Sequence, residues 1–117
     1  YEQFLVKKDV QFIEKIHQVI EENLDNSDFN IDTIASTIGL SRSAFFKKLK
    51  SLTGFAPVDL VKEIRLNKSI ELIKNSDMSI SEIAFAVGFK DSGYFSKCFR
   101  KKYDQTPREY MNEWRKG

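Results

Sequence analysis

The sequence contains little cysteine, proline or glycine, and this scarcity excludes several protein classes. Its 117 residues include one cysteine, which excludes a disulfide framework and any zinc site made of several thiolates. Only two prolines and five glycines interrupt the chain, so helices are the natural expectation. Charged residues make up 31% and apolar residues 41%, a balance that excludes both a disordered tail and a membrane span. We expect one soluble domain, or two very small helical units that share a core.

Charge is distributed unevenly along the chain, although the net charge is only +2. Residues 1–34 carry three lysines against eight acidic residues, and residues 35–117 carry sixteen basic residues against nine acidic ones. An acidic leader with a first helix (1–29) therefore precedes a basic body (30–117). A sign asymmetry of this kind favours a polyanionic partner for the body. The leader is expected to face the rest of a parent chain instead.

The N-terminus has no initiator methionine and no apolar run that could act as a cleavable signal. We expect a fragment of a longer cytoplasmic protein. Membrane anchoring of the parent chain is left open, whereas the fragment itself is expected to make no membrane contact. Self-association, if it occurs, is expected to run through the parent protein.

Apolar periodicity predicts four helices in the first two thirds of the chain. A stripe from Phe12 to Leu24 predicts a first helix from Asp9 to about Asn26. A short helix is expected at 31–38, with Asn30 as its cap and Gly39 as its left-handed stop. A third helix follows from the cap Ser41 to about residue 53. The fourth, at 57–74, is apolar on every side and fits a helix that connects two units.

The short helix and its successor are repeated later in the chain. Positions 31, 34, 35, 38 and 39 recur forty-nine residues on as Ile80, Ile83, Ala84, Val87 and Gly88. Beyond that glycine the offset becomes fifty, because one residue has been inserted, and Asp91 replaces Ser41 as the predicted cap. A last helix is expected to begin with Thr106 as cap and Pro107 as first residue, with Tyr110 and Trp114 on one face.

Each copy has the order short helix, tight turn, longer helix, which is that of a helix-turn-helix. We therefore predict an all-α protein of about seven helices, with units at about 30–55 and 79–104 joined by the helix at 57–74. Residues 41–54 and residues 90–103 each carry a net charge of +4. Two such helices could enter successive major grooves of double-stranded DNA, which recur about every 34 Å on one face.

These residues resemble those of the AraC/XylS family of DNA-binding domains over about 30–112. The second half matches at Ile83, Ala84, Val87, Gly88, Phe89, Asp91, Tyr94, Phe95, Phe99, Thr106, Pro107 and Tyr110. The first half matches at Ala35, Gly39, Leu40, Ser41, Leu49, Lys50, Gly54 and Pro57, with an Arg65-Leu66 pair on the connecting helix. The leader, the residues Ser41, Arg42 and Ser43, and the run from Lys47 to Lys50 are similar to the output module of hybrid two-component regulators.

The resemblance implies a sequence-specific transcription regulator domain and places its DNA contacts. Base-facing positions fall on Arg42, Ser43, Phe46 and Lys47, and on Ser92, Gly93, Tyr94, Ser96 and Lys97. Phosphate contacts are expected at Ser41, Lys50, Arg100, Lys101 and Lys102. Helical spacing independently puts positions 43, 46 and 47 on one face and the core positions 45 and 49 on the other.

Two roles are open for Phe46. Its exposed ring could contact a thymine methyl group, or it could pack against the first helix. Two departures from the family pattern also matter. Lys47 and Lys97 stand where relatives often have arginine, which weakens bidentate reading of guanine. Asp104 stands at a usual glycine, so the turn before Thr106 could adopt another conformation, although aspartate tolerates a left-handed one better than most residues.

Other functions find less support in the sequence. His17 is expected to be a surface or boundary residue, and Cys98 a small buried one. No Ser/His/Asp arrangement, paired carboxylates or cysteine set for alkyl transfer appears, so we expect no enzyme, no cofactor and no metal. The aromatic residues recur at core spacing, which argues against an RNA-stacking platform. The competing hypothesis is a helical protein-interaction module whose basic faces are incidental.

Overall fold

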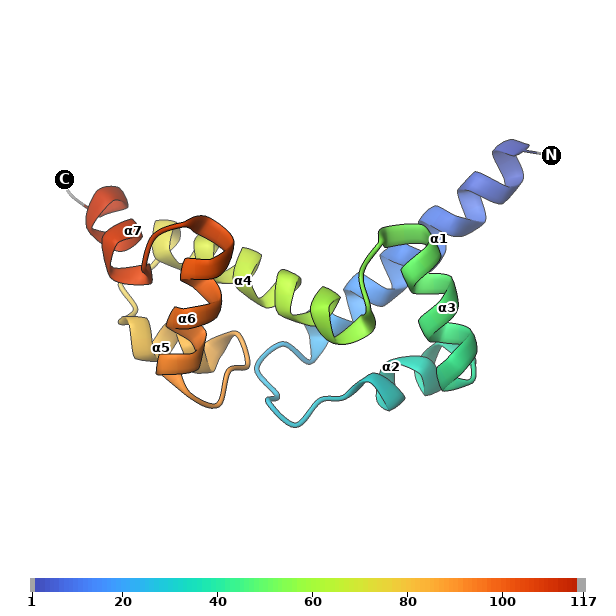
Figure 1. The fold of residues 1–117 in the computed structure, drawn as a ribbon, viewed down its shortest axis with the longest axis horizontal. Helices are drawn as coiled ribbons and strands as arrows, with labels where there is room; N and C mark the ends of the chain where they lie inside the picture. Colours follow the sequence, from blue (N-terminus) through green and yellow to red (C-terminus); the bar gives the residue numbers. More distant parts are fainter. Residues whose placement is uncertain (1, 116–117) are drawn as a thin grey trace. The chain divides into compact units, whose positions relative to one another are not determined.

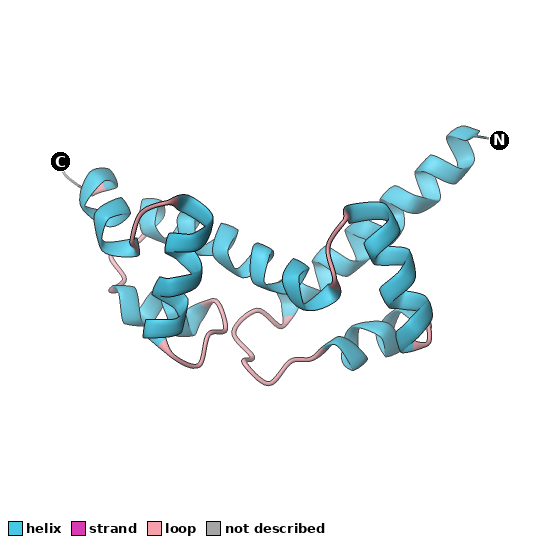
Figure 2. Cartoon of the chain, in the orientation of Figure 1, coloured by secondary structure: helices cyan, strands magenta, loops and turns pink. Residues whose placement is uncertain are grey.

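The structure is a computed structural model that describes residues 2–115, and the side chains of residues 6–115 (Figure 1). Its helices are α1 (Glu2–Glu22), α2 (Ile31–Ile38), α3 (Arg42–Thr53), α4 (Pro57–Asn75), α5 (Ile80–Ala86), α6 (Ser92–Tyr103) and α7 (Pro107–Trp114). Between residues 2 and 115 the chain forms helices and loops without a strand (Figure 2). The predicted all-α class with about seven helices is confirmed.

Helix α1 begins and ends earlier than the apolar stripe predicted. The expected range was Asp9 to about Asn26, whereas α1 covers Glu2–Glu22. The earlier start follows from the absence of proline and glycine in this stretch, so nothing interrupts the helix before its stripe begins. At the other end, the side chain of Asn23 donates to the carbonyl oxygen of Val19 at 2.9 Å and competes with the regular helical pattern.

The described chain divides into two compact units, with the boundary inside α4. Unit 1 holds residues 2–23 and 28–64, and unit 2 holds residues 24–27 and 65–115. In unit 1, α1 contributes the buried Phe12, Ile16 and Ile20, and α3 contributes Phe45 and Leu49. The rings of Phe12 and Phe45 lie 6.3 Å apart, so α1 covers the inner face of α3.

The core of unit 2 contains a continuous series of aromatic rings. Phe89, Phe95 and Phe99 are buried and follow one another at centroid distances of 5.2 and 5.8 Å. Phe99 also contacts Tyr103 and Tyr110, which lie on α6 and α7. Tyr110 continues to Trp114 at 6.0 Å, as their four-residue spacing predicted. These contacts fix α6 and α7 around one buried phenylalanine.

The loop after α1 enters unit 2 and packs against its turn. Gly88 has φ +98°, and a Cβ atom there would overlap the carbonyl oxygen of Leu24. Arg65 of α4 donates from Nη2 to the carbonyl oxygen of Asn26 at 3.2 Å. Burial lowers the pKa of the Arg65 guanidinium below its ordinary value. The turn between α5 and α6 is therefore in direct contact with a segment more than sixty residues earlier.

Candidate nucleic-acid interface

The two longer helices of the repeat, α3 and α6, both begin with a side-chain N-cap. The Ser41 hydroxyl accepts from the backbone N–H of Ala44 at 3.2 Å, and the Asp91 carboxylate accepts from that of Tyr94 at 3.0 Å. Both predicted caps are confirmed. Each satisfies an amide that would otherwise lack a partner at the helix start, so α3 and α6 begin at equivalent positions.

The preceding turns and the ends of these helices also correspond. Gly39 stops α2 in the left-handed conformation, as predicted, with φ +83°. Gly54 ends α3 with φ +79°, and Asp104 ends α6 with φ +60°. The backbone N–H of Gly54 donates a hydrogen bond of 2.9 Å to the carbonyl oxygen of Lys50, and that of Asp104 donates one of the same length to the carbonyl oxygen of Arg100. The turn at Asp104 therefore has the same left-handed conformation as its glycine counterpart, in spite of the substitution.

Helix α3 buries one face and leaves a basic face exposed. Phe45 and Leu49 have no exposed surface and point into unit 1. The exposed residues on this helix include all five of its predicted contact positions, namely Arg42, Ser43, Phe46, Lys47 and Lys50, and its cap Ser41 is exposed as well. Four of the twelve residues of α3 are basic and none is acidic, so every charged side chain on its exposed face is positive.

Two side chains of α3, those of Phe46 and Lys48, have surroundings that differ from those of adjacent residues. Phe46 is 47% exposed, whereas the adjacent Phe45 is fully buried. Lys48 turns toward the first helix, and its Nζ lies 4.3 Å from the centroid of the Phe12 ring. The lysine therefore covers the aromatic surface of α1 while about half of the Phe46 side chain stays available to a ligand.

Helix α6 presents a second basic face in unit 2. Phe95, Cys98 and Phe99 are buried, which confirms the expectation for the cysteine. Of the predicted contact positions, five are exposed and three are half-buried. The exposed ones are Gly93, Tyr94, Lys97, Arg100 and Lys101, and the half-buried ones are Ser92, Ser96 and Lys102. The basic residues in the last turn of α6 also lie at the negative end of the helix dipole.

Two of the predicted contact residues, Arg42 and Lys102, contact a polar side chain on another helix of their own unit. Arg42 lies with Nε 3.6 Å from Oδ1 of Asp32 on α2. Lys102 donates from Nζ to Oδ1 of Asn67 on α4 at 2.7 Å, and the hydroxyl of Tyr103 lies 3.1 Å from the same oxygen. Sequence reasoning missed both contacts, because each joins different helices and follows no local spacing rule.

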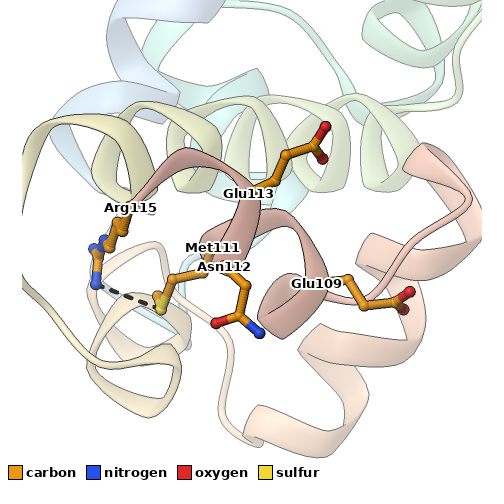
Figure 3. A pocket seen from close by; sticks show the side chains of 5 residues that line it. All are labelled: Glu109, Met111, Asn112, Glu113 and Arg115. Carbon is orange, nitrogen blue, oxygen red and sulfur yellow. Dashed lines mark hydrogen bonds between the residues drawn. The ribbon is translucent and has the colours of Figure 1, made fainter. Parts of the chain in front are cut away.

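A separate hollow of about 740 Å³ lies beside α7 and has a different character (Figure 3). Its lining includes the carboxylates of Glu109 and Glu113, which disfavour a polyanion. Arg115, its one cationic side chain, donates to the carbonyl oxygens of Ile73 and Met78 at 2.9 and 2.8 Å. That guanidinium therefore ties α7 to the end of α4 and is engaged within the protein.

Among residues 2–115 we found no cluster of three or more His, Cys, Asp or Glu side chains that could hold a metal ion. None of the helices formed by these residues is both long and apolar enough to cross a membrane. His17, on α1, is half-buried.

Comparison with known proteins identifies the fold. A family described as a helix-turn-helix domain matches residues 34–113, which include both basic helices. The chain belongs to the AraC/XylS family. A solved transcriptional regulator from Chromobacterium violaceum, described as AraC-type, is 27% identical with a TM-score of 0.83, over 92% of this chain and 95% of that one. The C-terminal domain of the two-component response regulator yesN from Fusobacterium nucleatum is 31% identical with a TM-score of 0.76, over 84% of this chain and 95% of that one.

Two other relatives of this AraC-type chain bear on its context. The DNA-binding domain of AdpA, a global transcriptional factor solved in complex with a target DNA, has a TM-score of 0.81 at 28% identity, over 90% of this chain and 93% of that one. Histidine kinase P4 from Formosa agariphila is 38% identical over 106 residues, 91% of this chain. The chain spans only 8% of the length of that kinase.

Proposed function

We propose that this AraC-type chain is the DNA-binding domain of a transcription regulator and binds duplex DNA through the exposed faces of α3 and α6. The observation that carries the proposal is the pair of acid-free basic helices, each fixed by a side-chain cap at its start and by buried phenylalanine beneath it. Because these helices are the second members of helix-turn-helix units, each fits the major groove. The AdpA domain, similar over nearly its whole length, was solved on DNA.

The predicted contacts divide into two classes in this proposal. Lys47 and Lys97 occupy equivalent positions at the exposed centres of α3 and α6, where side chains reach base edges. Lys50, Arg100 and Lys101 lie in the last turns and contact phosphates, which sets affinity and salt dependence more than sequence choice. Ser41 joins this second class from the start of α3. Lys102 has a weaker claim to it, because its ammonium group already binds Asn67.

The two units expose different side chains, so a single chain reads an asymmetric site, with each recognition helix in one of two successive major grooves. Two chains then bind repeats of that site. We place this function in the cytoplasm, as the output module of a longer two-component regulator whose own activity, self-association and membrane attachment lie in the parent chain. The DNA-binding step uses neither a cofactor nor a catalytic residue.

A mobility-shift titration on duplex DNA at 50 and 200 mM salt tests the proposal. We expect the dissociation constant to rise steeply with salt, since each neutralised phosphate contributes about −0.9 to the slope of log K against log salt. Replacing Lys50 and Lys101 by alanine is expected to reduce that slope by about 2. Lys15→Ala, which removes an exposed lysine on α1, is the matched control and should leave the slope unchanged.

The competing function, a helical protein-interaction module, makes the opposite prediction. Such a module would bind duplex weakly and without dependence on the α3 and α6 lysines. Binding that is absent, or that the Lys50 and Lys101 changes leave unaltered, would therefore reject the DNA-binding proposal.

A further inference from the structure

We propose that Asp32 orients Arg42 to read one guanine, and that this pair makes unit 1 more selective than its positive charge alone would. The inference rests on the proposed DNA-binding function and concerns how the α3 face chooses its site. Asp32 lies in the first turn of α2, and Arg42 is the first residue of α3. Their side chains meet through Nε and Oδ1 at 3.6 Å.

The backbone on both sides of this contact is held in place. Asn30 caps α2 by accepting from the N–H of Thr33 at 3.1 Å, and Ser41 caps α3 directly before Arg42. Between the two helices, the N–H of Gly39 donates to the carbonyl oxygen of Ala35 at 2.9 Å. Because the caps define where both helices begin, Asp32 and Arg42 start from fixed positions at the same end of the unit.

The chemistry of the contact leaves the recognition edge of the arginine open. A guanidinium has one Nε donor and two Nη groups, and guanine presents the acceptors O6 and N7 side by side in the major groove. At 3.6 Å the contact is an exposed ion pair and not a hydrogen bond, so the carboxylate attracts the Nε side of the guanidinium and biases its orientation. Both Nη groups then face away from the carboxylate and can bind the base. The side chains are 73% and 66% exposed, so both can meet a ligand.

The same carboxylate has a second, opposite effect on binding. Its negative charge repels the phosphates of any duplex and so weakens binding that does not depend on sequence. A guanine that accepts hydrogen bonds from Arg42 offsets this repulsion. A base that cannot accept them leaves the repulsion in full. Selectivity therefore rises while overall affinity falls, a combination that a purely structural residue would not produce.

Unit 2 lacks this device. The residue forty-nine positions after Asp32 is Ser81, and the residue fifty positions after Arg42 is Ser92. Neither serine can form an ion pair. The two halves of the chain thus provide an internal comparison for the role of Asp32.

The test uses two duplexes: one selected by the wild-type chain from a random pool, and a scrambled version of it. Arg42→Ala is expected to remove the preference for a guanine in the selected duplex. Asp32→Asn should weaken the preference for that same guanine by about threefold, while binding to the scrambled duplex becomes about twofold tighter. In the Arg42→Ala background, Asp32→Asn should have no further effect on base preference.

Two controls separate this effect from loss of charge or of fold. Asp25→Asn removes another exposed carboxylate and should not change the base preference. Asp32→Glu keeps the charge in the first turn of α2 and should restore at least part of the preference. The inference is overturned if Asp32→Asn leaves the preference unchanged, or if it weakens binding to both duplexes equally. A wild-type chain that binds no duplex at all rejects the proposed function itself, and this result is obtained before any variant is made.

Discussion

The two helix-turn-helix units share their framework but only part of their exposed surface. Ser41 and Asp91 cap equivalent helices, Phe45 and Phe95 occupy equivalent buried positions, and Gly54 and Asp104 end the helices in the same conformation. On the exposed faces, by contrast, unit 1 has Arg42 and the half-exposed Phe46 where unit 2 has two serines. The repeat therefore preserves the residues that position each helix more closely than those on its exposed face.

The largest difference between the units is expected when the turn glycines Gly39 and Gly88 are replaced. Gly88→Ala should destabilise unit 2 by about 3 kcal/mol or more, because the new Cβ would overlap the carbonyl oxygen of Leu24 in addition to the left-handed strain. Gly39→Ala should cost only about 1 to 2 kcal/mol, since a Cβ there would meet no described atom within 4 Å. Urea denaturation monitored by circular dichroism measures both. Equal losses would contradict the close approach seen at Gly88.

The equivalent lysines test whether the units read separate halves of a site. Lys47→Ala and Lys97→Ala should each relax the preference at a different position of the selected duplex, by about 1 kcal/mol or more. Together they should abolish sequence preference while binding that is driven by phosphates persists. Competition binding against duplexes with single base changes measures the effect. Unaltered preference in the double variant would mean that the reading faces have been assigned wrongly.

The helix ends provide a smaller, reciprocal test. Asp104→Gly should raise the free energy of unfolding by about 0.5 to 1 kcal/mol, because glycine adopts the observed φ of +60° without steric cost. Gly54→Asp in unit 1 should lower it by a similar amount. Thermal unfolding of both variants measures the changes. A destabilised Asp104→Gly variant would show that the carboxylate contributes something beyond the turn.

The smallest effect that we expect is an acid sensitivity that two glutamates confer on unit 2. The carboxylates of Glu82 and Glu109 each accept from the backbone N–H of a cap residue, Ser79 or Thr106, and these bonds lower the pKa of both groups below 4.5. A lowered pKa in the folded state stabilises the protein above the unfolded value. This contribution is lost as the pH falls through the folded pKa.

The variant Glu82→Gln/Glu109→Gln keeps hydrogen-bonding groups at both positions but removes the charge. It should therefore flatten the decline of unfolding free energy between about pH 5 and pH 3. Denaturation at a series of pH values measures this slope. An unchanged slope would mean that other carboxylates dominate acid sensitivity.

The sequence was sufficient to predict features that depend on neighbouring residues. The caps at Asn30, Ser41, Asp91 and Thr106 all form as predicted, because a capping side chain needs only an amide three residues away. The forty-nine and fifty residue offsets likewise predicted that the short and the longer helix recur, as α2–α3 and α5–α6 do. The start of α1 was missed, since an apolar stripe marks the part of a helix that packs and not the part that extends beyond it.

The candidate site was predictable as a set of exposed positions but not as a set of interactions. Burial of Phe45 and Leu49 follows from helical spacing, and it leaves the opposite face of α3 exposed. The contacts of Arg42 with Asp32 and of Lys102 with Asn67 cross between helices. Such pairs depend on how helices pack, which periodicity alone does not specify.

Trp114 gives the chain a built-in spectroscopic probe of one unit. It is the only tryptophan in the sequence and lies on α7 of unit 2, 53% exposed, with Nζ of Lys74 4.2 Å from its ring centroid. Its fluorescence therefore reports the environment of unit 2 alone, whereas far-ultraviolet ellipticity reports the helices of both. Unfolding curves that coincide for the two signals would demonstrate a single cooperative transition, and curves that separate would give each unit its own stability.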